Sequence, residues 1–152
     1  MNSNYTSYSN EGMFYFCSSL TSLIIDNFNT SSINNMLNMF GGCSSLNILN
    51  LSSFDTSHVI DMTNMFYYCK LLQSLDLSNF DTSSLKSSES MFRNCDLLKL
   101  INLSNFNTSS VTLMKYIFYG CKSLIFLDYL ILTLIWLLTW VICFMNVVLC
   151  NH

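Results

Sequence analysis

The chain has 152 residues, which is the usual length of one domain. Its net charge is −3 and its six basic residues are scattered singly, so we expect no nucleic-acid partner. It has seven cysteines, an odd number, and five of them recur at one fixed spacing, which is a poor fit to a disulfide framework.

The first segment, residues 1–12, reads MNSNYTSYSNEG and is polar and rich in turn-forming residues. It has no basic residue and no apolar core, so it does not match a secretory signal peptide. We interpret it as a polar N-terminal stretch that precedes the repeats, and we expect the chain as written to lack a signal peptide.

From residue 13 onward the sequence repeats with a period of 26 residues. Four complete units span 13–38, 39–64, 65–90 and 91–116, and a fifth keeps the pattern from 117 to 128. Each unit has one cysteine, one phenylalanine and one leucine at matched positions: Cys17, Cys43, Cys69, Cys95 and Cys121; Phe14, Phe40, Phe66, Phe92 and Phe118; Leu20, Leu46, Leu72, Leu98 and Leu124. A fixed period of this size indicates stacked repeats, so we predict one solenoid domain over residues 13–128.

The first two parts of each unit predict a strand and a turn. Leucines in the pattern Leu-x-x-Leu-x-Leu, as at Leu72, Leu75 and Leu77, end in an alternation that is typical of a short strand with one buried face. A segment around a phenylalanine, such as Phe54, then leads into Asp-Thr-Ser. Asp55 and its equivalents are good helix caps, because a short side-chain oxygen can accept a backbone N–H.

The third part of each unit predicts a helix. Its apolar residues lie three or four positions apart, which is the spacing of one helix face. Val59, Met62, Phe66 and Cys69 form this pattern in one unit. At the third unit Ser88 replaces the methionine, which predicts a local weak point.

Together these parts predict an α/β repeat. The expected fold is a leucine-rich-repeat-like solenoid of four to five 26-residue coils, each with a short parallel strand and a short helix. Identical side chains of successive coils should stack between the strands and the helices, because one unit cannot bury its apolar face alone. We also expect an apolar helix at the C-terminal end.

The repeated text MFxxCxSLxxLDLSxFDTSxVxxM resembles the 26-residue surface-protein repeat of BspA-like leucine-rich-repeat proteins, which occur in bacteria and some protists. The resemblance covers roughly residues 13–128. It implies a cell-surface or secreted parent protein of adhesin type that binds host proteins or other cells.

The tail, residues 129–152, has two interpretations. Its segment 130–149 has no charged residue and is long enough to span a bilayer, which would make the chain a tail-anchored membrane protein with a repeat head. Alternatively, the tail is a repeat that is translated out of frame. One T inserted after the Asp128 codon allows the next residues to become Leu-Ser-Asn-Phe-Asp-Thr, which the repeat requires there. In that case the chain is a truncated fragment without a function of its own.

The chemistry-bearing residues favour structural roles. The cysteines lack the close pairs that a zinc site needs, and they share the apolar face, so we expect them in the core. His58 and His152 are isolated. The aspartates Asp76 and Asp128 fall on outward strand positions rather than in a close pair. We therefore expect no enzyme activity, no metal site and no cofactor.

The outward face of the strands is the candidate binding site. Its positions alternate with the buried leucines, and they vary between units while the core positions do not. A scaffold with a selectable surface has this pattern, although drift at unconstrained solvent positions would also produce it. The predicted partner-binding residues are Asn47, Ile48, Asn50, Gln73, Ser74, Asp76, Lys99, Leu100, Asn102, Ile125, Phe126 and Asp128. We expect a host or cell-surface protein as the partner, and self-association through the ends of the solenoid, which lack polar caps.

Overall fold

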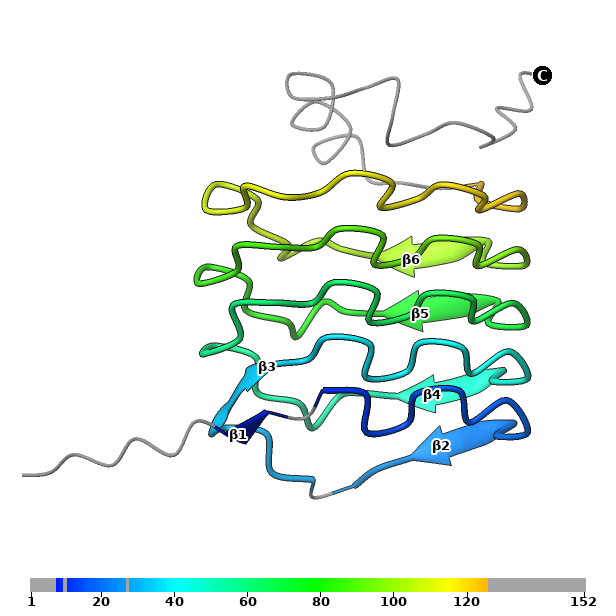
Figure 1. Cartoon of the computed structure of the whole chain (residues 1–152), viewed down its shortest axis with the longest axis horizontal. Coiled ribbons are helices and arrows are strands. Elements are labelled where there is room, and N and C mark those ends of the chain that lie inside the picture. Colours follow the sequence, from blue (N-terminus) through cyan, green and yellow to red (C-terminus); the bar gives the residue numbers. More distant parts are fainter. Residues whose placement is uncertain (1–7, 10, 27, 126–152) are drawn as a thin grey trace, which may run out of the picture.

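The structure is a stack of coils, and each coil adds one level (Figure 1). It is a computed structural model that describes residues 8–9, 11–26 and 28–125. The described strands are β1 (Tyr8–Ser9), β2 (Ser22–Ile24), β3 (Ile33–Asn35), β4 (Ile48–Asn50), β5 (Ser74–Asp76) and β6 (Leu100–Asn102). They form three parallel pairs, β1 with β3, β2 with β4, and β5 with β6. The predicted short parallel strands are therefore present.

One side of the stack consists of β2, β4, β5 and β6, which we call the strand wall. Its residues alternate between the core and the solvent, as a short half-buried strand requires. Leu75 and Ile101 are buried at the centres of β5 and β6, while their neighbours on each strand are exposed. Leu75 lies beside Ile101 in the register, which is an offset of one full repeat.

The predicted helix in each coil is wrong. None of the described residues lies in a helix. The segments that we predicted as helices are runs of turns on the other side of the core, and we call them together the turn wall. The turn wall contains residues 11–17, 36–43, 62–69, 88–95 and 114–121.

Backbone hydrogen bonds between coils hold the turn wall together. The N–H groups of Met62, Asn64 and Phe66 donate to the carbonyls of residues 87, 89 and 91 in the next coil, at 2.9, 3.0 and 2.9 Å. The intervening residue Met65 and the following residue Tyr67 donate instead to the carbonyls three residues earlier and close tight turns. A helix would direct each of these N–H groups to the carbonyl four residues earlier within its own segment.

Two residues of every turn-wall segment have left-handed backbone conformations. The first series has φ between 55° and 62°, and the second between 56° and 78°. The two series are Gly12, Asn38, Asn64, Ser90 and Tyr116, and Phe16, Gly42, Tyr68, Asn94 and Gly120. A left-handed residue at every fourth position interrupts a right-handed helix. In this chain the buried residues three or four positions apart, such as Met62, Phe66 and Cys69, result from successive turns that point toward the core.

The aspartate caps close turns instead of helices. The side chain of Asp55 accepts the N–H of Ser57 at 3.0 Å and its hydroxyl at 2.7 Å. The adjacent Thr56 is buried, and its hydroxyl donates to the carbonyl of Asp81 in the next coil at 2.9 Å. The predicted C-terminal apolar helix, and the tail 129–152 as a whole, lie outside the described residues.

The core is built of identical side chains in columns, as predicted. The rings of Phe14, Phe40, Phe66, Phe92 and Phe118 stack with centroids 5.3 to 5.7 Å apart and planes within 7° of parallel. Beside them the thiol of each buried cysteine donates to the carbonyl of a phenylalanine in the preceding coil. Cys69 bonds to Phe40 in this way at 3.2 Å. The cysteines therefore belong to the core from Cys43 to Cys121, whereas Cys17 in the first coil is exposed.

Substitution of Asn64 distinguishes turns from a helix. Its φ of 57° lies in the left-handed region, where alanine is strained and glycine is not. Asn64→Ala should lower the free energy of unfolding by about 1 kcal/mol, and Asn64→Gly should leave it nearly unchanged. Urea unfolding of the two variants measures this difference. A helix would give the reverse order, because alanine is favoured over glycine in a helix by about 1 kcal/mol.

Ser88, the predicted weak point, interrupts a buried column of methionines. Ser88 is completely buried, and its hydroxyl has no hydrogen-bond partner among the described residues. The equivalent residues Met36, Met62 and Met114 are all buried. Ser88→Met should therefore raise the free energy of unfolding, by about 1–2 kcal/mol, because it removes an unpaired buried hydroxyl and extends an apolar column.

Thermal and urea unfolding of the Ser88→Met variant test this expectation. The matched control is Lys86→Met at an exposed position two residues before Ser88, which should change stability by less than about 0.5 kcal/mol. A Ser88→Met variant that is less stable than the original chain would mean that the column has no room for the longer side chain.

Candidate functional site

The predicted site lies on the outward side of the strand wall. Every predicted site residue in the described part of the chain is exposed: Asn47, Ile48, Asn50, Gln73, Ser74, Asp76, Lys99, Leu100, Asn102 and Ile125. Phe126 and Asp128 lie outside the described residues. The alternation of the strands therefore directs these side chains away from the core, as the sequence pattern requires.

The parallel register brings the site residues of successive coils together. Ser74 pairs with Leu100, and Asp76 pairs with Asn102. The columns continue through backbone hydrogen bonds, since Lys99 donates to the carbonyl of Gln73 at 2.9 Å. Ile125 donates in turn to the carbonyl of Lys99 at 3.1 Å. The site is consequently a set of short columns, each with one side chain per coil.

Two further residues belong to this face and were missed. Ser22 pairs with Ile48, and Ile24 pairs with Asn50, so the first coil extends the same columns. Both residues are exposed. The signal was present in the sequence, because each lies one period before a predicted site residue.

Three of the predicted site residues also have a structural role. The side chains of Asn50, Asp76 and Asn102 accept the N–H two residues later, at 3.0, 3.0 and 3.2 Å, and begin the turn that follows each strand. The N–H and hydroxyl of Ser78 hold the pKa of Asp76 below its usual value, with a smaller contribution from Asn102. Asp76 is thus a carboxylate at neutral pH, and its oxygen is partly occupied by the backbone.

The remaining positions give the face an apolar character. Ile24, Ile48, Leu100 and Ile125 are 63%, 55%, 54% and 72% exposed. Asn47, Gln73 and Lys99 lie beside them as polar neighbours. The face therefore combines exposed aliphatic side chains with amides and single charges.

The outward side of the turn wall is a second variable surface, which sequence reasoning missed. Its residues come in pairs, such as Tyr67 with Tyr68 and Arg93 with Asn94, because two positions of each turn face outward. The assignment of this segment to a helix hid the pairs. The repeat period would have revealed them, since the matched positions in successive coils are Tyr15, Gly41, Tyr67, Arg93 and Tyr119.

Three of the buried cysteines, Cys43, Cys69 and Cys95, are held as neutral thiols. Burial raises the pKa of Cys43 from 9.0 to about 11, with a further contribution from Cys17. Burial also raises the pKa of Cys69 and of Cys95. Over the described ranges, no group of three or more histidine, cysteine or acidic side chains is placed to hold a metal ion. His58 is exposed and lies 3.0 Å from the hydroxyl of Ser57.

The described part of the chain has no helix with the length and apolar character needed to cross a membrane. The segment 130–149, which we predicted as a possible anchor, lies outside that part. The tail-anchored alternative and the out-of-frame alternative both stay predictions.

The stacked coils and their two outward faces define this chain as a repeat protein. Residues 8–126 match a family model described as "Mycoplasma protein of unknown function, DUF285". The chain belongs to this family, because the match covers well over half of its length. No curated protein and no solved structure matches the chain.

The cysteine column predicts an order of thiol reactivity. Cys17 is exposed, whereas Cys69 and Cys95 are buried with raised pKa values. Alkylation by iodoacetamide at about pH 8 should therefore modify Cys17 first, and Cys69 and Cys95 at least about tenfold more slowly, because the thiolate is the reactive form. Peptide mapping by mass spectrometry resolves each site, and the urea-unfolded chain should react evenly. Equal rates in the folded chain would contradict the burial of the column.

Proposed function

We propose that the chain is a non-enzymatic interaction module that binds a protein partner through the outward side of the strand wall. The observation that carries this proposal is the contrast between the two sides of each strand. The inward positions carry leucine or isoleucine and are buried or partly buried, while the outward positions differ from coil to coil and are exposed. A rigid stack with a variable exposed surface is the arrangement that repeat proteins use for binding.

The chemistry of the face supports a protein partner. Ile48 and Leu100 offer apolar area near the middle of the columns, and Gln73 and Lys99 supply hydrogen-bond donors beside them. Protein interfaces typically combine an apolar centre with a polar rim. The variable positions carry aliphatic, amide and single charged side chains rather than a nucleophile beside a base, which favours binding over catalysis.

We further propose that the parent protein acts at the cell surface or is secreted, and that its partner is a host or cell-surface protein. The resemblance of the repeat text to BspA-like surface proteins supports this location. The membership of a repeat family described from Mycoplasma is compatible with it. The BspA-like identity itself is part of the proposal.

Self-association through the ends of the stack remains a proposal as well. Phe14, Leu20 and Phe28 of the first coil are only partly buried, whereas Phe40, Leu46 and Phe54 at the matched positions of the second coil are buried. The apolar columns are thus less covered in the first coil, which favours contact with another apolar surface.

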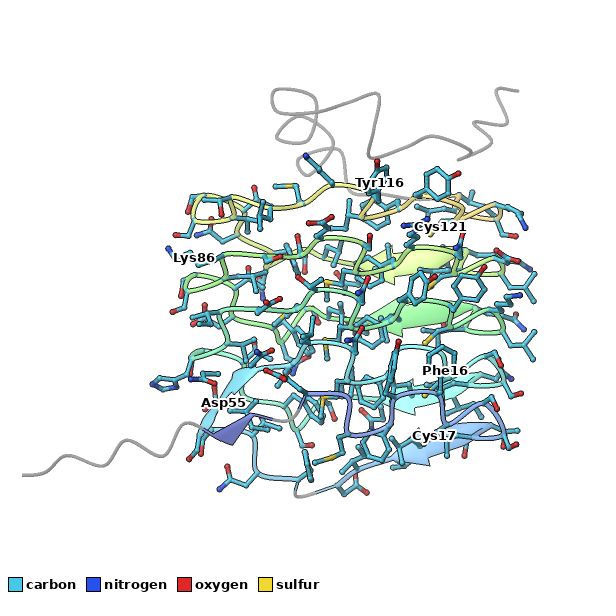
Figure 2. The ribbon with its side chains drawn as sticks, viewed as in Figure 1. Phe16, Cys17, Asp55, Lys86, Tyr116 and Cys121 are labelled. Carbon is cyan, nitrogen blue, oxygen red and sulfur yellow. The ribbon has the colours of Figure 1, made fainter. Side chains whose placement is uncertain are left out.

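A cell-binding experiment tests the role of the strand wall. The labelled chain should bind cultured animal cells, and Ile48→Glu with Leu100→Glu should weaken binding at least about tenfold, since each charge would enter the apolar centre of the interface. Lys86→Glu is the matched control, because Lys86 is exposed at the bend of the coil (Figure 2). It should change binding by less than about twofold.

Treatment of the cells with protease identifies the class of partner. Loss of binding after this treatment supports a protein partner. Binding that survives the treatment, or that is unaffected by Ile48→Glu with Leu100→Glu in a folded chain, would contradict the proposal.

A further inference from the structure

Arg93 is a cation held against aromatic rings on the outward side of the turn wall. It is the single arginine of the sequence. Its guanidinium carbon lies 5.1 Å from the ring centre of Tyr119, 5.4 Å from Tyr116 and 6.0 Å from Tyr67. A guanidinium at these distances is attracted by the negative faces of the rings, and its orientation is restricted by all three.

The guanidinium has no anionic partner within residues 8–9, 11–26 and 28–125. Its Nε is buried and has no hydrogen-bond partner there. The ion pair found in those ranges, between Lys122 and Asp96 at 3.2 Å, does not involve it. A buried N–H without an acceptor costs free energy. Because the Nε is buried, a carboxylate would pair with the guanidinium through its two terminal amino groups, which can donate two parallel hydrogen bonds. Arg93 is therefore oriented but lacks its natural counter-ion.

Arg93 lies within a line of aromatic side chains along the stack, which we call the aromatic strip. The strip consists of Tyr15, Phe16, Tyr67, Tyr68, Tyr116 and Tyr119, together with Arg93. Figure 2 labels Phe16 and Tyr116, which mark its two ends. A second cation, Lys70, lies 4.9 Å from the ring centre of Tyr68. The strip thus combines aromatic area with two positive charges.

The second coil has Gly41 and Gly42 at the positions where the third coil has Tyr67 and Tyr68, and these glycines leave room for the rings of the first coil. A side chain at Gly41 would meet the ring of Tyr15, and one at Gly42 would lie 2.8 Å from the ring of Phe16. The two rings of the first coil therefore lie over the glycines, toward the third coil, where Tyr67 and Tyr68 follow. Tyr15 and Phe16 are 46% and 58% exposed, so this end of the strip is open to a partner.

We propose that the aromatic strip binds an extended acidic segment of a protein partner, with one carboxylate of that segment paired to Arg93. The strip contains one cation, Arg93, and no carboxylate, and a second cation, Lys70, lies against the ring of Tyr68. Both positive charges attract a carboxylate of a partner. Tyrosine and arginine are also the residues that contribute most to binding at protein interfaces. A densely charged polyanion fits less well, because the whole chain has a net charge of −3.

This inference concerns a different surface from the proposed function and does not depend on it. The strand wall offers aliphatic side chains and amides, whereas the strip offers rings and cations. Two surfaces of unlike chemistry on one stack select unlike partners, or unlike parts of one partner. Substitutions on one wall leave the other wall intact, so failure of one proposal is distinguishable from failure of the other.

A peptide-binding experiment with the full chain tests the inference. The probe is a fluorescent peptide that alternates glutamate and proline, because this sequence is extended, acidic and able to pack rings against tyrosines. The matched probe alternates glutamine and proline. We expect the glutamate peptide to bind at least about tenfold more tightly in fluorescence anisotropy, and Arg93→Gln to remove this preference.

Two variants serve as controls. Arg93→Lys keeps a cation near the rings but loses the paired hydrogen bonds, so it should weaken glutamate-peptide binding by a smaller factor than Arg93→Gln. Lys86→Gln removes a cation at the bend, away from the strip, and should change binding by less than about twofold. Circular dichroism verifies that each variant is folded, and Arg93→Lys still tests the pairing if Arg93→Gln does not fold.

Two outcomes would overturn the inference. Equal binding of the two peptides, or equal binding by the original chain and a folded Arg93 variant, would mean that Arg93 is merely solvated at its outer edge. Binding of heparin that depends on Arg93, without binding of the glutamate peptide, would assign the strip to a sulfated polysaccharide instead of a protein.

Discussion

The backbone hydrogen bonds between coils along the turn wall are the constraint on which the rest of the structure depends. Met62 donates to residue 87 and Phe66 to residue 91, and the same offset of 25 residues recurs in the coils before and after. An insertion of one residue within a coil would change this offset for every bond that spans the insertion, and would separate those donors from their acceptors. The period of 26 residues is thus fixed by backbone geometry, and the side-chain columns follow from it. Parallel phenylalanine rings, threonines that bond to the next coil and thiols that bond to the preceding one all need this constant offset.

The same constraint explains which residues occupy the left-handed positions of the turn wall. An alternation of inter-coil bonds and tight turns requires two left-handed residues in each segment. Asn38, Asn64 and Gly120 meet this requirement at little cost, because glycine and asparagine tolerate positive φ. Tyr68 and Tyr116 do not, so their positions carry strain. Both tyrosines lie in the aromatic strip, where their rings contact Lys70 and Arg93. Strained residues that persist are often found at functional surfaces, and their presence here is consistent with binding by the strip.

The sequence was sufficient to predict the period, the short parallel strands, the buried columns and the exposure of the strand-wall residues. These features depend on the alternation of apolar and polar residues and on exact repetition, and both are visible in the amino-acid sequence. The helix could not be distinguished from a run of turns, because Val59, Met62, Phe66 and Cys69 have the same spacing in both. What decides between them is the destination of each N–H, and the partners of Met62 and Phe66 lie in another coil. The same error hid the second surface. In a helix, neighbours such as Tyr67 and Tyr68 would point in different directions, whereas in the turn wall both lie on its outward side.

The two outward surfaces can change independently because neither one determines the fold. The hydrogen bonds that set the period involve backbone atoms, and the columns that fill the core point inward from both walls. The side chains of Gln73, Lys99 and Arg93 contribute to neither. The exceptions are the positions where an outward side chain also shapes the backbone, as Asp76 does in its turn. Such positions alternate among asparagine and aspartate in the coils that contain β4, β5 and β6, whereas the free positions range from isoleucine to lysine. The residue type therefore varies most, on each wall, at positions where the side chain does not shape the backbone. At these positions a binding surface can adapt to a partner without loss of the stack.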